Sequence, residues 1–335
     1  MNGVARQGLS VQLVSRPEGV LERGHFAIVD MPAPHLPPGW VLVHNRYVAL
    51  DPHPAALAAR HWPLHRAVSA GSLIGEVVAS RSADLPPGSL IAHRGGWSTY
   101  SALPRGGHST RVLRPPAGVP VDAYLTVLGL PGLAAHVGLT SVLKLGPGES
   151  LFIAGAADPV GTATARIARM LGASRIVGGV TSPGGAGMAA QQSCFDAVFE
   201  SRPGQGDGTG SPFRHAGVDA AVVGGAGTSL ADALHWVRDL GRIAWLHGSP
   251  AHPGDRSAAL DLSPVHRRGI RVEGFGLQHH LHRLKEIEHQ YVDELSAGRL
   301  HPGKSLEVDF DRLVDVLIDA TRSGFQPADT YRLVG

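Results

Sequence analysis

The stretch Ser150–Leu171 (SLFIAGAADPVGTATARIARML) constrains the fold of this chain more than any other. A short apolar run leads into a tight turn that contains glycine, and a helical pattern follows. This strand–turn–helix unit is the one with which nucleotide-binding sheets begin. Its turn should read G-x-x-G-x-x-G, but it runs from Gly155 to Gly161 with Asp158 at the middle glycine. The stretch therefore predicts a dinucleotide-binding scaffold with a carboxylate beside the expected pyrophosphate.

Two regions of different pattern make up the chain. Residues 1–122 show short β-rich runs separated by Gly/Pro turns, which predicts a small β-barrel-like domain. Further along, strand signals alternate with helical ones, which predicts a doubly wound parallel sheet. Its expected strands are 151–154, 175–180, 196–199, 218–223, 242–247 and 270–275. A last strand signal at 330–334 is expected to return to the first domain, so we predict an α/β protein with domains at 1–122 with 305–335, and at 123–304.

The composition excludes several classes of function. Thirty Lys and Arg residues against 28 Asp and Glu, with no basic run, argue against a nucleic-acid partner. The single cysteine, Cys194, rules out an internal disulfide and a cysteine-rich zinc site. No apolar run approaches the roughly 18 residues of a membrane span, and the first residues have no apolar signal region. We therefore expect a cytoplasmic protein with no membrane partner.

Short motifs along nearly the whole chain carry a resemblance to a known family. They are SRPEG at 15–19, NRYVALDP at 45–52, GW at 96–97, GLPGL at 129–133, GRIA at 241–244 and EGF at 273–275. In this order they resemble the medium-chain dehydrogenase/reductase superfamily. They are most similar to its zinc-independent branch of leukotriene hydroxydehydrogenases, prostaglandin reductases and alkenal double-bond reductases.

The resemblance implies a fold and an activity. The fold would be a GroES-like, β-rich catalytic domain plus a Rossmann domain, often as a homodimer. The activity would be hydride transfer from NADPH to the β-carbon of an enone or enal in a small hydrophobic, unsaturated substrate. The zinc ligands of other branches are absent, so no metal is expected, and the run His279–His280 with His282 is not interpreted as a metal site.

The residues expected along the cofactor depart from the family pattern at several points. In the turn they are Gly155, Asp158, Val160 and Gly161; Thr181 follows the second strand where a basic residue or an acid would stand, and Gly224 ends the fourth strand after Val222. At about 4 Å and an effective dielectric of 20, Asp158 would repel a phosphate by roughly 4 kcal/mol. Alternatively, Asp158 caps the helix that follows. The cofactor implied by the resemblance is NADP(H), and these departures leave its loss open.

Three histidines stand where the family has tyrosines. Aligned by motif, they are His53, His136 and, in the loop 247–253, His252. A histidine with a pKa near 6.5 exchanges protons at neutral pH, unlike a tyrosine with a pKa near 10, so these three are the candidate catalytic residues. Each could instead only pack where a tyrosine did. Trp62, Trp97 and Trp245 could give the substrate an aromatic wall.

The sequence thus leaves three functions open. The first is NAD(P)H-dependent reduction of an activated C=C bond. The second is an enzyme of the same fold that has lost hydride transfer and uses histidines for isomerisation, elimination or cyclisation. The third is a non-catalytic protein that binds a small molecule.

Overall fold

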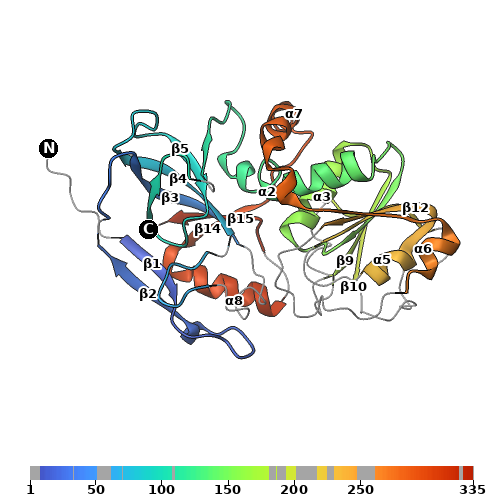
Figure 1. Ribbon diagram of the computed structural model, residues 1–335, viewed down its shortest axis with the longest axis horizontal. Coiled ribbons are helices and arrows are strands. Elements are labelled where there is room, and N and C mark those ends of the chain that lie inside the picture. The colour runs from blue at the N-terminus through green and yellow to red at the C-terminus, as the bar shows by residue number, and fades with distance from the viewer. Residues whose placement is uncertain are drawn as a thin grey trace. The chain divides into compact units, whose positions relative to one another are not determined.

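The computed structural model describes the chain except residues 1–7, 33, 51–61, 70, 108–109, 181–185, 187–193, 201–216, 225–229, 247–260, 324–326 and 335. The chain divides into two compact units (Figure 1). The first unit comprises residues 1–125, 303–322 and 328–335, and the second comprises 126–302 and 323–327. No described helix is long and apolar enough to cross a membrane.

The strands of the first unit pair antiparallel, except for one parallel pair between residues 305–309 and 330–334. A two-stranded sheet pairs β1 (Gly8–Leu13) with β2 (Phe26–Met31). A seven-stranded sheet has the order β14-β15-β3-β4-β5-β7, with β6 on β3. Its strands are β3 (Trp40–Leu50), β4 (Gly71–Ser80), β5 (Leu90–His93), β6 (Tyr100–Pro104), β7 (Arg111–Leu113), β14 (Ser305–Asp309) and β15 (Thr330–Val334). The last strand, β15, thus returns to this unit by pairing with β3.

One amphipathic helix completes the core of the first unit. In α8 (Leu313–Ser323), the apolar residues Leu313, Val314 and Leu317 are spaced along one face and are buried. They pack with Trp97, which is fully buried, in the same core. Trp97 is therefore part of the core and not of an aromatic wall. Short 3₁₀ turns lie at Arg23–His25, Val121–Leu125 and Phe310–Arg312.

The second unit contains a parallel sheet with the strand order β10-β9-β8-β11-β12-β13. The strands are β8 (Ser150–Ala154), β9 (Arg175–Val180), β10 (Ala197–Glu200), β11 (Val218–Val223), β12 (Val237–Leu246) and β13 (Arg271–Phe275). Numbered along the chain, this order is 3-2-1-4-5-6, the doubly wound order of dinucleotide-binding sheets. The predicted fold class, a β-rich domain plus a doubly wound parallel sheet, is confirmed.

The second unit also contains helices and one π-helical segment. They are α2 (Leu130–His136), which continues as the π-helical segment η3 (Val137–Val142), α3 (Pro159–Met170), α5 (Leu230–Trp236), α6 (Ser263–Arg268) and α7 (Leu284–Ser296). Two 3₁₀ turns, η5 (Leu277–His279) and η6 (Leu281–Arg283), precede α7, so the regular helix begins at Leu284. Strand β12 begins five residues earlier than predicted, and the exposed Leu240 in its first half has φ +61°.

Candidate functional site

The backbone of the turn after β8 requires glycine at two positions, one because of its dihedral angles and one because of a close backbone contact. Gly155 has φ +71°, in the left-handed region where a Cβ is unfavourable. A Cβ on Gly161 would overlap the carbonyl oxygen of Gly155, so the first turn of α3 passes directly over the end of the strand. Since α3 begins at Pro159, the N–H groups of Val160 and Gly161 precede the first helical hydrogen bond, from Thr162 N–H to the Asp158 carbonyl (2.9 Å). They and the helix dipole offer an anion site.

The predicted residue on the neighbouring strand lies at the same place. Gly224 follows β11, which pairs in parallel with β8. A Cβ built on Gly155 would come within 3.1 Å of the Gly224 carbonyl oxygen, so the ends of the two strands nearly touch. The boundary between β8 and β11 is where the strand order reverses, and ligands of open parallel sheets bind at such a point. The structure therefore brings together the described cofactor residues of the prediction, Gly155, Asp158, Val160, Gly161 and Gly224.

Asp158 occupies the N-cap position of α3, but its side chain turns back over the strand end. The N-cap dihedral angles are extended (φ −81°, ψ 155°), and the carboxylate forms no capping hydrogen bond with the helix. Its Oδ2 atom is shielded from solvent and would lie 2.5 Å from a Cβ on Gly155. The alternative that Asp158 caps α3 through its side chain is therefore wrong. The carboxylate lies inside the turn, beside the backbone that a pyrophosphate would approach.

His136, the one predicted catalytic histidine in the described residues, lies in a polar cluster between α2 and α7. Arg283 Nη2 donates a hydrogen bond to its Nε2 (2.9 Å), and since a guanidinium only donates, the ring proton lies on Nδ1. Nδ1–H then donates to the Tyr291 hydroxyl (2.7 Å). Arg283 also binds Glu286 through two hydrogen bonds of 2.7 and 2.8 Å. We call His136, Arg283, Glu286 and Tyr291 the α2–α7 cluster.

The electrostatics of this cluster favour a neutral His136. Burial first, and then the Arg283 guanidinium, hold the pKa of His136 below its ordinary value, while Glu286 opposes them. The hydrogen bond from Arg283 lowers the pKa of Glu286 to about 2, and burial raises the pKa of the Tyr291 hydroxyl. His136 is 2% exposed and both of its ring nitrogens have partners. This geometry suits a group that holds two helices together better than one that exchanges protons with a substrate.

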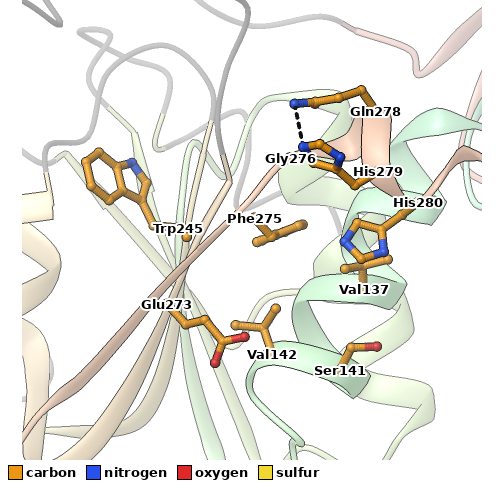
Figure 2. Close-up of a pocket in the computed structure, with 11 residues that line it drawn as sticks. Val137, Ser141, Val142, Trp245, Glu273, Phe275, Gly276, Gln278, His279 and His280 are labelled. Carbon is orange, nitrogen blue, oxygen red and sulfur yellow. Dashed lines mark hydrogen bonds between the residues drawn. The ribbon is translucent and has the colours of Figure 1, made fainter.

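A pocket of about 560 Å³ opens where β12 and β13 end, next to α2 and η3. In Figure 2, Phe275 lies between Trp245 and His280, and the Glu273 carboxylate lies below it. Trp245 is 47% exposed, which is unusual for a tryptophan on a central strand. The His280 ring meets Phe275 edge-on, with 6.5 Å between the ring centroids. We call this the Trp245–His280 pocket; its described lining is Val137, Ser141, Val142, Trp245, Glu273, Gly274, Phe275, Gly276, Gln278, His279 and His280.

The sequence pointed to this pocket only in part. The sequence offers Trp245 for an aromatic wall, whereas it presents His280 only as part of a histidine run and not as a site residue. The pocket joins the segments 137–142, 245 and 273–280, which nothing in the local pattern connects. Among the described residues, no group of three or more His, Cys, Asp or Glu side chains could hold a metal ion. The predicted residues His53, His252 and Thr181 lie outside the described residues.

Comparisons with known proteins agree with this architecture. The family model of the N-terminal domain of oxidoreductase matches residues 10–112. YfmJ of Bacillus subtilis (strain 168), a provisionally named NADP-dependent oxidoreductase, is 28% identical over 324 residues, which are 92% of each chain. The (+)-pulegone reductase of Mentha piperita is 25% identical over 284 residues, 78% of this chain and 81% of the reductase. The crystal structure of CurA from Vibrio vulnificus in complex with NADPH has a TM-score of 0.76 at 20% identity, covering 98% of this chain and 99% of CurA.

Proposed function

Since the chain belongs to the medium-chain dehydrogenase/reductase superfamily, we propose that it is an NADP(H)-dependent oxidoreductase that reduces an activated C=C bond, in an enone or enal, of a small hydrophobic metabolite. The names of relatives such as pulegone reductase and alkenal reductase support this substrate class. The observation that carries the proposal is the meeting of Gly155, Gly161 and Gly224 at the point where the strand order reverses.

The backbone of the turn fits a dinucleotide. Gly155 and Gly161 leave no room for a side chain, and the N–H groups of Val160 and Gly161 stand at the start of α3. These groups would hold the pyrophosphate, and NADPH would supply the hydride. Asp158 is the one described group that opposes the fit, because its carboxylate adds negative charge inside the turn. We therefore propose that NADPH binds, and that Asp158 weakens its binding.

Further parts of the prediction belong to this proposal. The first unit would be the GroES-like catalytic domain and the second the nucleotide-binding domain. Thr181 would face the adenosine end of the cofactor, and a homodimer in the cytoplasm without a metal is expected. Of the three histidines expected to exchange protons, His53 and His252 remain candidates on the sequence alone. The buried geometry of His136 argues against its own role as an acid or base, so the non-redox alternative would depend on His53 and His252.

A calorimetric titration of the purified protein with NADPH tests the proposal. Removing the charge of Asp158 should tighten binding by about tenfold or more, because the repulsion of two charges at short range is several kcal/mol. Asp158→Asn removes the charge and keeps the volume, while Asp158→Gly removes both. Asp84→Asn, which loses a surface carboxylate of the first unit that pairs with Arg105, is the matched control.

The outcomes separate the parts of the argument. Equal tightening in Asp158→Asn and Asp158→Gly assigns the effect to charge; tightening in Asp158→Gly alone assigns it to volume. The absence of NADPH binding in the wild type and in both Asp158 variants would overturn the proposed function. Oxidation of NADPH in the presence of an enone, monitored by absorbance, then tests the reaction itself.

A further inference from the structure

A second cavity, of about 480 Å³, lies in the first unit and shares no described residue with the glycine turn or the Trp245–His280 pocket. It opens where strand β3 changes its partner, because β3 pairs with β6 along residues 40–44 and with β15 at residues 47–48. Residues 44–47 and 332–334 line it. Its volume is in the range of small-molecule sites. We call it the bulge site, because β3 contains a β-bulge there.

The β-bulge presents Arg46 at this cavity. The pairing of β3 with β4 passes from Asn45 directly to Tyr47, so Arg46 is an extra residue without a partner on β4. The two strands are close here, since a Cβ on Gly75 of β4 would come within 2.9 Å of Asn45 Oδ1. Bulges re-aim side chains and are frequent beside functional sites. Arg46 is exposed, although Asn45 before it is buried.

A buried hydrogen-bond network fixes the floor of the bulge site. The Asn45 side-chain nitrogen donates to the Ser98 carbonyl (2.7 Å) and to the Ser101 hydroxyl (2.9 Å). The Asn45 side-chain oxygen accepts from His93 Nε2 (2.8 Å). All four residues are at most 5% exposed. The backbone next to Arg46 is therefore held in place before a ligand arrives, which lowers the entropic cost of binding.

The register of the sheet brings charged side chains from three strands to this cavity. Glu76 on β4 is the partner of His44 on β3, and Arg332 on β15 is the partner of Tyr47 on β3. Partners on adjacent strands carry their side chains on the same face. Arg46, Glu76 and Arg332 all line the cavity. Two guanidinium groups and one carboxylate thus stand among its described lining residues.

These charged groups do not saturate one another. Arg46 Nη2 lies 4.0 Å from Glu76 Oε2, which is too long for a hydrogen bond, and neither side chain has a hydrogen bond to another described residue. Arg332 uses Nη1 for Glu307 (3.2 Å), but its Nε and Nη2 have no partner in the described part of the chain. A guanidinium can bind a carboxylate through two parallel N–H groups. Both arginines of the cavity therefore keep donors for a ligand.

The opposite charges decide which kind of ligand fits the bulge site. A ligand with only a carboxylate would lie beside Glu76 as a like charge, and a ligand with only an ammonium would meet both arginines. A zwitterion avoids both conflicts, because its carboxylate can bind Arg46 and Arg332 while its ammonium binds Glu76. The cavity also offers apolar surface, from Leu90, Val121 and Phe310.

We propose that the bulge site binds a zwitterion, an α-amino acid with an apolar side chain, whose carboxylate lies at Arg46 and Arg332 and whose ammonium lies at Glu76. This site belongs to the first unit and uses none of the groups assigned to NADPH. The inference therefore goes beyond the proposed function and does not depend on it. Binding of an amino acid and binding of NADPH are separate results.

Leucine and two analogues test the need for both charges. 4-Methylpentanoate lacks the ammonium of leucine, and 3-methylbutylamine lacks its carboxylate. In titrations of the full chain monitored by NMR at neutral pH, L-leucine should bind at least about threefold more tightly than either analogue. The amide shifts should be centred on residues 44–47, 76 and 332–334. Absence of leucine binding, or equal binding of the three compounds, would overturn the proposal.

Two variants test which side chain binds which charge. Arg46→Met removes a partner of the carboxylate, so leucine and 4-methylpentanoate should bind about threefold more weakly and 3-methylbutylamine as tightly or more tightly. Glu76→Gln should weaken leucine and 3-methylbutylamine by a similar factor and leave 4-methylpentanoate as tight or tighter. Arg105→Met is the matched control, since Arg105 is an exposed arginine of the first unit that pairs with Asp84 outside the bulge site. If Arg46→Met or Glu76→Gln binds leucine as tightly as Arg105→Met does, the assignment is wrong.

Discussion

The glycine turn after β8 and the α2–α7 cluster both belong to the second unit, yet they are held together by different means. In the turn, backbone meets backbone, and Gly161 must lack a side chain because the Gly155 carbonyl occupies its place. In the cluster, side chains meet, and His136 is held through hydrogen bonds to Arg283 and Tyr291. The turn therefore requires residues that have no side chain, whereas the cluster requires polar side chains that can form particular hydrogen bonds.

The largest effect is expected where a side chain would enter the turn. Gly161→Ala would force α3 away from β8, because the obstacle is backbone and cannot rotate aside. Overpacking of this kind should lower the free energy of unfolding by about 2–3 kcal/mol. Gly19→Ala, at a glycine with nothing within 4 Å of its added Cβ, should change it by less than about 0.5 kcal/mol. Urea unfolding measures both, and equal values for the two variants would contradict the close approach.

This difference also explains what the sequence could predict. The turn lies within seven residues, Gly155–Gly161, so its strand, its glycines and the exceptional Asp158 were all visible in one stretch. The doubly wound parallel sheet followed from the alternating patterns, although the early start of β12 did not, because residues 238–240 are exposed and Leu240 has a positive φ. Only the direction of the Asp158 side chain, inside the turn and not toward the helix, required coordinates.

The cluster and the pocket could not be predicted in this way. A family position points to His136, but its partners are about 150 residues away in the chain: Arg283 at the end of η6 and Tyr291 on α7. Arg283 also donates to Ser141 (2.8 Å), and so joins the start of α7 to a wall of the pocket. Contacts between side chains of distant helices leave no local pattern from which they could be inferred.

A buried histidine in the first unit separates the effect of burial from that of charged partners. His93 is 2% exposed; its Nε2 donates to Asn45 Oδ1 (2.8 Å), and Gly95 N–H donates to its Nδ1 (3.0 Å). Burial lowers the pKa of His93 to about 4. Because the unfolded value is about 6.5, the unfolded state binds more protons below that pH. The stability that His93 contributes is complete above pH 6.5 and is lost as the pH falls toward 4.

Between pH 7 and pH 5 this loss should be about 2 kcal/mol. The pKa of His136 is also lowered, so its contribution has the same sign, but Glu286 works against the shift. Urea unfolding at both pH values should show that His93→Asn removes most of the pH dependence and His136→Asn removes less. A larger change in His136→Asn would mean that the charged partners do not offset burial.

The smallest expected effect measures how much the hydrogen bonds of Arg283 to His136 and Ser141 add to the stability that its ion pair with Glu286 provides. Arg283 and Arg299 bind Glu286 and Glu294 with nearly the same geometry, through Nε at 2.7 Å and Nη2 at 2.8 and 3.0 Å. Arg299 is 61% exposed, whereas Arg283 is 19% exposed and also donates to His136 and Ser141. Arg299→Met should therefore leave the free energy of unfolding nearly unchanged, whereas Arg283→Met should lower it by about 1–1.5 kcal/mol.

A second measurement distinguishes lost bonds from a general disturbance of α7. The Arg283 guanidinium is one cause of the lowered pKa of His136, so Arg283→Met should raise that pKa, while Arg299→Met should leave it unchanged. A pH titration monitored by NMR measures the pKa of His136 in each variant. Equal losses of stability in the two variants, with no change in the His136 titration, would mean that α2 and α7 are joined by apolar packing and that the hydrogen bonds of the cluster contribute nothing to their attachment.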